Sequence, residues 1–203
     1  MARALLAILV VAAAGCGAGS SSPDPTLDRQ LIEAAFANDV ERAADLIDRG
    51  ANVNTKDETQ QSAYLIATSE VGDDPRLLEL TLDNDAKVND KDRFDGTGLI
   101  RAAERGHARI VRRLLQTDIE EDHVNRLGWT ALHEAIVLGE GGRRHTATVE
   151  VLVAGGVDVN VPDGDGVTAL AHAEERGYEE IARILRAAGA KRTLGEEGTP
   201  ETR

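Results

Sequence analysis

The sequence predicts an all-α fold in which about five helix-turn-helix units stack into a solenoid with β-turn loops. Three observations support this prediction: a pattern that repeats about every 33 residues, an apolar content of 41% with only five aromatic residues, and regularly placed Ser, Thr and Gly. A core made of Leu, Ile, Val and Ala suits packed helices better than a β-sandwich.

The first 15 residues are predicted to be a lipoprotein signal peptide. Arg3 supplies a positive charge, and residues 5–14 form an apolar run shorter than the roughly 20 residues that span a bilayer. Small residues then precede Cys16, the only cysteine. This segment resembles a bacterial lipobox, although Ala13 stands where Leu is usual. The alternatives are an ordinary signal peptide with an incidental cysteine, or a cytoplasmic chain that is not processed.

Residues 16–27 are predicted to be the lipidated cysteine followed by a flexible tether rich in Gly, Ser and Pro. Lipidation would hold the chain outside the cytoplasm, in the periplasm or at the cell surface, with the anchor as its only membrane contact. The net charge of −13 repels phosphate groups, so neither nucleic acid nor an anionic membrane surface is an expected partner. A single cysteine excludes a disulfide framework and a zinc site made of cysteines.

The repeats are predicted to occupy residues 28–190. A Gly or Asp slot recurs with spacings of 35, 33, 38 and 33, and a Ser or Thr follows each of the first four slots by 12 residues. The extra residues fall at 72–75 and 140–144, between helices, where a stacked repeat tolerates insertions. The expected units are about 28–57, 58–92, 93–125, 126–163 and 164–190, followed by a disordered tail at 191–203. The slots are Gly50, Asp85, Asp118, Gly156 and Gly189.

Each unit is expected to contain two helices joined by a turn. Thr130 is the predicted N-cap of a first helix, and Thr97 and Thr168 occupy the same slot in neighbouring units. The turn contains a glycine such as Gly106, and a second helix follows with apolar residues at helical spacing. This second helix is expected to end in left-handed backbone, which glycine adopts easily, at Gly50, Gly156 and Gly189.

The stretch Thr130-Ala131-Leu132-His133 and the repeated "A-x-V-N" element resemble the ankyrin repeat family, and the resemblance covers about residues 28–190. It implies a non-catalytic protein-binding scaffold without a cofactor, and a structural role for His133. The first unit lacks the Thr-x-Leu-His box, as expected of an N-terminal cap. Asp85 and Asp118 stand where the family prefers glycine, which suggests looser helix ends there.

The resemblance also implies that a protein partner binds the loop tips and the inward face of the first helices. Phe94, Trp129, Val137 and Leu138 are predicted to form the central patch, because rigid aromatic side chains are favoured interface anchors. Residues 140–144 are either a basic hook for an acidic surface or a solvated turn. The full set of expected partner-binding residues is Phe36, Arg93, Phe94, Glu104, Arg105, Arg126, Leu127, Trp129, Val137 and Leu138.

Several functions stay open at this point. The chain could protect or inhibit an envelope or secreted enzyme, or it could organise several envelope proteins, in either case as an expected monomer. A rival hypothesis is a hydrolase or metal enzyme that uses His133, Glu134 and His145. The sequence "HEAIV" does not match H-E-x-x-H, and neither a G-x-S-x-G motif nor a phosphate-binding glycine loop is present.

Overall fold

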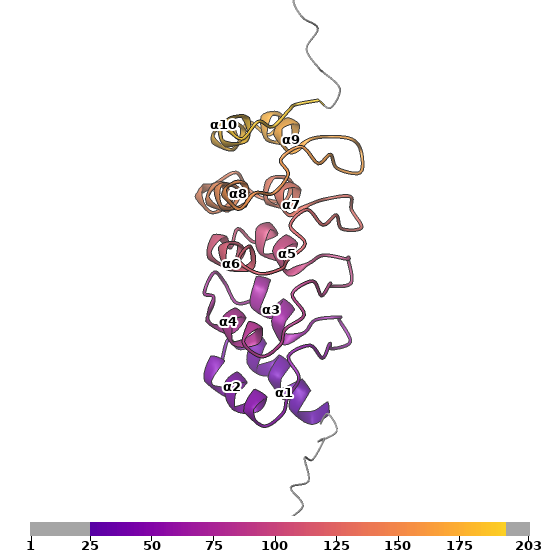
Figure 1. The fold of residues 1–203 in the computed structure, drawn as a ribbon, viewed down its shortest axis with the longest axis vertical. Helices are drawn as coiled ribbons and strands as arrows, with labels where there is room; N and C mark the ends of the chain where they lie inside the picture. The colour runs from indigo at the N-terminus through magenta and orange to yellow at the C-terminus, as the bar shows by residue number, and fades with distance from the viewer. Residues whose placement is uncertain (1–24, 194–203) are drawn as a thin grey trace, which may run out of the picture.

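The computed structural model describes residues 25–193, which form ten α-helices stacked as five pairs in a solenoid (Figure 1). This confirms the predicted fold class. The five pairs are called repeats 1 to 5 below, in chain order. The helices are α1 (Pro25–Phe36), α2 (Val40–Asp48), α3 (Ala63–Ser69), α4 (Arg76–Leu82), α5 (Gly98–Glu104), α6 (Ala108–Leu114), α7 (Ala131–Val137), α8 (Arg143–Gly155), α9 (Ala169–Glu175) and α10 (Glu179–Ala187).

The predicted signal peptide, Cys16 and most of the predicted tail lie outside the described residues. Within 25–193, none of the helices is long and apolar enough to cross a membrane. Two expected boundaries differ from the structure. The first helix begins at Pro25, so the last three residues of the predicted tether are helical. The start of the predicted tail is bound to the loop that follows repeat 4, because Lys191 N–H donates to Asn160 Oδ1 at 2.8 Å.

The first helices of the repeats stack into one column and the second helices into another, with the loops projecting from the side of the first helices (Figure 1). Neighbouring first helices are in contact along the whole column, from α1 to α9. The second-helix column is less regular. Its members pack against their neighbours at α2–α4, α6–α8 and α8–α10, whereas α4 and α6 make few contacts.

Threonine is the N-cap residue of three of the first helices. Thr97 Oγ1 accepts the N–H of Ile100, Thr130 Oγ1 accepts that of His133, and Thr168 Oγ1 accepts that of Ala171, at 3.3–3.5 Å. Each bond satisfies a donor that the first turn of a helix leaves unpaired. Small residues then allow the helices to approach closely, since Ala102 and Ala103 of α5 are both completely buried.

The second helices end where the backbone turns left-handed. Gly50, Gly156 and Gly189 have φ values of 101°, 98° and 83°. Asp85 occupies the same slot with φ of 62°, a conformation that aspartate tolerates better than most residues with a Cβ. Gly106, in the turn of repeat 3, has φ of 69°, and a Cβ there would lie 3.2 Å from the Cβ of Arg144.

An asparagine that follows three of the slots by four residues ties one repeat to the next. Asn54 Nδ2 donates to the Asp85 carbonyl, and Asn54 Oδ1 accepts the N–H of Lys87, at 2.9 and 2.8 Å. Asn89 and Asn160 make the same pair of bonds to the following repeat. Asp122 occupies this position in repeat 3, and its carboxylate accepts the N–H of Asp158 at 2.9 Å. The recurring asparagine is visible in the sequence as the last residue of the "A-x-V-N" element, but its partners in the next repeat are not.

Candidate binding surface

The loop tips that project from the solenoid are shaped by one acceptor at the base of each loop. Asp92 Oδ1 accepts the backbone N–H groups of Phe94 and Gly96, at 2.8 and 2.9 Å. Side-chain oxygens of Asp57, Asn125 and Asp163 accept the N–H groups two and four residues further on in the same way. Such turns hold the backbone rigid without secondary structure.

In three of the loops, the second polar atom of the loop-base side chain contacts the first helix of the repeat. The partner is the residue nine positions further along the chain. Asp92 Oδ2 pairs with Arg101 Nη1 at 2.8 Å, and Asp163 Oδ2 pairs with His172 Nε2 at 2.7 Å. In repeat 4 the chemistry is reversed, because Asn125 Nδ2 donates to Glu134 Oε1 at 2.6 Å. These three loop tips are therefore fixed to the helix behind them, whereas Asp57 bonds only within its own loop.

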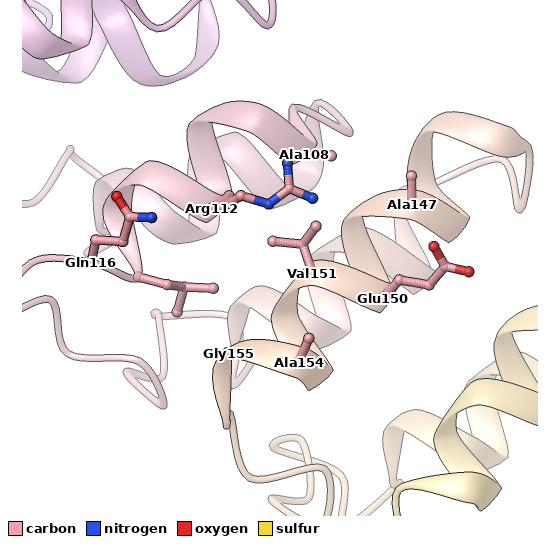
Figure 2. A pocket seen from close by; sticks show the side chains of 9 residues that line it. Ala108, Arg112, Gln116, Ala147, Glu150, Val151, Ala154 and Gly155 are labelled. Carbon is pink, nitrogen blue, oxygen red and sulfur yellow. The ribbon is translucent and has the colours of Figure 1, made fainter.

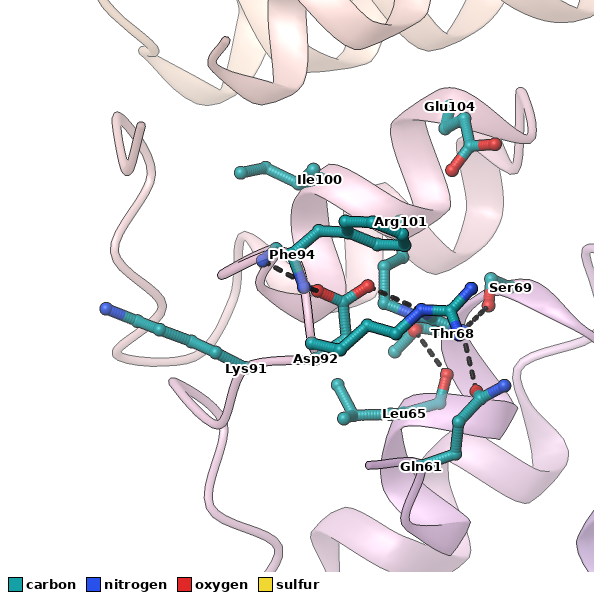
Figure 3. Close-up of polar contacts among 12 residues, drawn as sticks. Gln61, Leu65, Thr68, Ser69, Lys91, Asp92, Phe94, Ile100, Arg101 and Glu104 are labelled. Carbon is teal, nitrogen blue, oxygen red and sulfur yellow. Dashed lines mark hydrogen bonds and ion pairs between the residues drawn. The ribbon is translucent and has the colours of Figure 1, made fainter. Parts of the chain in front are cut away.

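Arg101 is the centre of a network that joins repeats 2 and 3 (Figure 3). Besides pairing with Asp92, its guanidinium donates to Gln61 Oε1 at 2.8 Å and to Ser69 Oγ at 2.7 Å, and lies 3.1 Å from Glu70 Oε1. Its side chain is only 12% exposed. Because Asp92 also binds the N–H of Phe94, this network positions the Phe94 loop tip.

A groove of about 530 Å³ lies in front of this network, between the loops and the first helices. It brings together five of the residues expected to bind a partner, which come from repeats 1 and 3. Phe36 and Phe94 are 47% and 51% exposed, and the Arg93 guanidinium lies 4.7 Å from the centre of the Phe94 ring. The five residues are Phe36, Arg93, Phe94, Glu104 and Arg105.

A second hollow of about 600 Å³ adjoins the groove and shares Glu70, Glu104 and Arg105 with it. It reaches Leu138 at the end of α7, which is 50% exposed. Of the predicted central patch, Phe94 lines the groove and Leu138 the second hollow, whereas Trp129 and Val137 are half-buried and line neither. The patch stays a prediction.

The remaining two loop residues of the expected set lie beside Phe94. Arg126 N–H donates to the Phe94 carbonyl at 3.1 Å, and the Arg126 guanidinium donates to the Arg93 carbonyl at 2.8 Å. Leu127 is 56% exposed at the next tip. Arg126 thus ties adjacent loops together.

The segment at 140–144 is neither a hook nor a free turn. Arg143 and Arg144 are the first residues of α8, and the Arg144 guanidinium donates to the carbonyl of Arg105 at the end of α5. His145 Nε2 donates to the Glu104 carbonyl at 3.0 Å. The inserted residues therefore cover the last carbonyls of α5, which have no partner within their own helix.

His133 is buried at the start of α7. Its Nδ1 lies 2.9 Å from Thr130 Oγ1 and accepts the Thr130 N–H at 3.4 Å, which completes a capping box. Its ring meets the edge of the His172 ring with centroids 5.9 Å apart. Burial lowers the pKa of His133, since a charged imidazole would lose its hydration there.

Glu134 is the least expected polar group of this surface. Its side chain is 4% exposed, and burial raises its pKa from 4.5 to about 7, against a weaker opposite effect of the Asn125 hydrogen bond. Its Oε2 atom makes no hydrogen bond. The sequence analysis named Glu134 only as part of the rival enzymatic hypothesis, and its burial follows from the packing of α7 behind the loop.

The residues of the rival enzymatic hypothesis are held apart by these contacts. His133 contacts Thr130 and His172, Glu134 contacts Asn125, and His145 binds α5. Across the described part of the chain, no three His, Cys, Asp or Glu side chains are placed to hold a metal ion.

Comparison with known proteins agrees with the repeat geometry. A family model described as ankyrin repeats in three copies matches residues 64–163. The putative ankyrin repeat protein YahD of Escherichia coli strain K12 is 44% identical over 146 residues, which cover 71% of this chain and 72% of that protein.

Solved structures give the same result. The crystal structure of an ankyrin repeat domain from Acinetobacter baumannii AYE superposes with a TM-score of 0.74 at 44% identity, covering 79% of this chain and 81% of that one. The ankyrin repeat protein EF0377 superposes with a TM-score of 0.71 at 37% identity, covering 77% and 78%. The chain therefore belongs to the ankyrin repeat family, whose members are generally non-catalytic modules that bind other proteins.

Proposed function

We propose that this chain is a lipid-tethered scaffold outside the cytoplasm that binds one protein partner across the concave groove. The observation that supports this most directly is the pair of exposed rings, Phe36 and Phe94, at the groove. Aromatic side chains held rigidly on a polar surface contribute strongly to protein interfaces. The Arg101 network fixes one of these rings before a partner arrives, which lowers the entropy lost on binding.

The partner that we propose is an envelope or secreted enzyme that the chain protects or inhibits. A single preformed groove suits a tight, one-to-one interaction better than it suits the binding of several different proteins by an organiser. The groove also contains carboxylates, such as Glu104, beside the exposed guanidinium of Arg105, so a partner surface with charges of both signs would be complementary.

The binding site is tested by affinity capture from an envelope extract, with the full chain as bait. The Phe36→Ala/Phe94→Ala variant should lose the captured enzyme, whereas Leu127→Ala, which removes an equally exposed apolar side chain outside the groove, should retain it. Substitutions at such exposed positions change the free energy of unfolding by about 0.5 kcal/mol or less, which circular dichroism can check. Equal capture by both variants would disprove the groove as the binding site.

The captured enzyme then distinguishes the two modes of action. Addition of the purified chain should change the activity or the inactivation rate of the enzyme with a one-to-one end point. An enzyme that shows neither change, together with several weakly captured proteins, would instead support an organiser of envelope proteins.

The lipid tether rests on the sequence around Cys16 and on the compartment that it implies. Expression of the full chain in a bacterial host should give a membrane-bound product whose N-terminal peptide carries acyl chains by mass spectrometry. Cys16→Ser should release the chain from the membrane fraction. A parent chain of unmodified mass in the soluble cytoplasmic fraction would support the unprocessed cytoplasmic adaptor.

A further inference from the structure

Helix α6 carries three arginines on the convex side, away from the groove. Arg109, Arg112 and Arg113 follow the spacing that places residues on one helical face. The first two are exposed and the third is half-buried. Within residues 25–193, none of their guanidinium groups has an ion-pair or hydrogen-bond partner. Like charges at this spacing repel, which offsets part of the stabilisation that Arg112 and Arg113 give to the C-terminal turn of α6.

Several arginines near the other second helices are paired with a carboxylate, although Arg42 of α2 and Arg143 of α8 are not paired within the described residues. Arg183 of α10 pairs with Glu180 at 2.9 Å, and Arg186 pairs with Glu174 at 2.6 Å. At the end of α2, Arg49 pairs with Asp45 at 3.2 Å. What distinguishes α6 is that it carries, on one short helix, three guanidinium groups that are unpaired in the described part of the chain, with Glu79 as the carboxylate that lines the same hollow.

The arginines lie between two hollows of the convex surface. On one side, where α4 and α6 make few contacts, a hollow of about 200 Å³ is lined by Pro75, Glu79 and all three arginines. On the other side, a trough of about 490 Å³ runs between α6 and α8. Arg112 and Gln116 line both hollows, so the two are continuous across α6.

Most of the residues that line the trough are small or apolar. Arg112 and Gln116 line it from the side of α6, whereas Ala147, Val151 and Ala154 line it from α8 (Figure 2). Small side chains along α8 leave room for side chains of another protein to enter. Glu150 also lines the trough but forms no ion pair with Arg112 within the described chain.

We propose that this convex surface is a second docking site, and that it takes an acidic segment of a protein partner. Carboxylates of the segment pair with Arg109, Arg112 and Arg113, and its small apolar side chains enter the trough beside Val151. Guanidinium groups match carboxylates in a two-pronged geometry, which gives the pairing both strength and direction. The scaffold then has two faces and can hold two proteins at once.

A protein segment fits this surface better than a nucleic acid or a lipid bilayer does. Three arginines form a short row, and the body that carries them has a net charge of −13, which repels an extended polyanion. An acidic segment of a few residues avoids most of that repulsion. The apolar trough would also contribute no hydrogen bonds or charges to the binding of phosphate groups.

The test uses the full chain and a fluorescein-labelled peptide of 18 residues built from Glu, Ala and Leu, with binding followed by fluorescence anisotropy. A second peptide carries Gln in place of every Glu. The parent should bind the Glu peptide, and Arg109→Gln/Arg112→Gln/Arg113→Gln should weaken binding by at least about tenfold, as should use of the Gln peptide.

The matched control is Arg49→Gln/Arg183→Gln/Arg186→Gln, which changes the formal charge equally, from −13 to −16, at arginines that have partners. Its affinity should stay within about twofold of the parent, because long-range charge alone changes little at physiological salt. The groove variant Phe36→Ala/Phe94→Ala should bind the peptide as the parent does. If the α6 variant still captures the proposed partner and the groove variant still binds the peptide, the two binding sites are distinct.

Three results would overturn the proposal. The first is equal weakening in the α6 variant and the charge-matched control. The second is equal binding of the Glu and Gln peptides. The third is arginine-dependent binding to vesicles that contain phosphatidylglycerol without binding to the Glu peptide, which would assign the surface to a membrane.

Discussion

The junction between repeats 2 and 3 and the junction between repeats 3 and 4 use the same positions with opposite chemistry. At the first junction, Arg101 pairs with Asp92 at the loop base and also binds Ser69 of the preceding repeat. At the second junction, Glu134 occupies the slot of Arg101, and Asn125 occupies that of Asp92. The first junction buries a paired cation, whereas the second buries a carboxylate with one donor.

The asparagine that links repeats differs between the same two junctions. Asn89 both donates to the Asp118 carbonyl and accepts the Glu120 N–H, at 2.9 and 2.7 Å. Asp122 can accept only, and it binds the Asp158 N–H. The stack thus tolerates poor polar pairing at one junction, because each junction is held by many independent contacts, including those of Arg144 and His145.

The largest effect is expected at the well-paired junction. Arg101→Ala leaves Asp92, whose side chain is 9% exposed, without its cation and removes the bonds to Gln61 and Ser69. We expect the free energy of unfolding to fall by about 3 kcal/mol, as is usual when a buried ion pair loses one member. Urea denaturation measures this. Arg105→Ala, on the same helix but half exposed, should change it by about 0.5 kcal/mol or less.

The two junctions should also differ in their dependence on pH. Because the pKa of Glu134 is about 7 in the folded chain and 4.5 is its ordinary value, this group favours the folded state below pH 4.5 and loses that contribution as pH rises through 7. A shift of this size corresponds to about 3 kcal/mol. Glu134→Gln removes the titration while keeping an acceptor for Asn125.

We therefore expect Glu134→Gln to stabilise the chain, and the gain in unfolding free energy to be about 2 kcal/mol larger at pH 8 than at pH 5. Denaturation of parent and variant at both pH values measures the difference, and Glu175→Gln, at an exposed position at the end of α9, is the control. A gain that is independent of pH would show that the pKa of Glu134 is the same in the folded and the unfolded chain, and so that burial does not raise it.

The sequence predicts the local structure of the repeats well because short-range rules determine it. N-cap threonines such as Thr97 and helix-ending glycines such as Gly50 act within one turn of backbone, and their spacing repeats. The predicted N-terminal boundary is less accurate, since a helix can continue beyond the repeat pattern, as α1 does from Pro25.

The burial and the contacts of the predicted binding residues depend on neighbouring repeats, so the sequence of a single repeat does not predict them. Trp129 reads as an exposed loop-tip residue, yet it is half-buried, and nothing in its own repeat reveals this. Arg101 and Glu134 read as ordinary charges on a helix, since the partner of each lies nine residues away at the loop base. The sequence suggests that Arg144 belongs to a basic hook, whereas in the fold its guanidinium donates to a carbonyl at the end of α5.

The smallest effect is expected from repairing the link between repeats 3 and 4. Asp122→Asn gives this position the donor that Asn54, Asn89 and Asn160 use toward the slot carbonyl of the next repeat, which here is Gly156. One added hydrogen bond should raise the free energy of unfolding by about 1 kcal/mol, or the melting temperature by about 3 °C in a domain of this size.

Differential scanning calorimetry of Asp122→Asn should be compared with that of Glu121→Gln, which removes the same charge from the same loop at a side chain that makes no hydrogen bond or ion pair within the described residues. An equal rise in both variants would mean that relief of acidic repulsion, rather than the hydrogen bond, stabilises the junction. The reverse change, Asn89→Asp, should lower the melting temperature by a similar amount, because it imposes on the junction between repeats 2 and 3 the acceptor-only contact found at the next junction. If the two reciprocal substitutions shift stability in opposite directions, the difference between the junctions lies in this amide donor and not in the backbone geometry that they share.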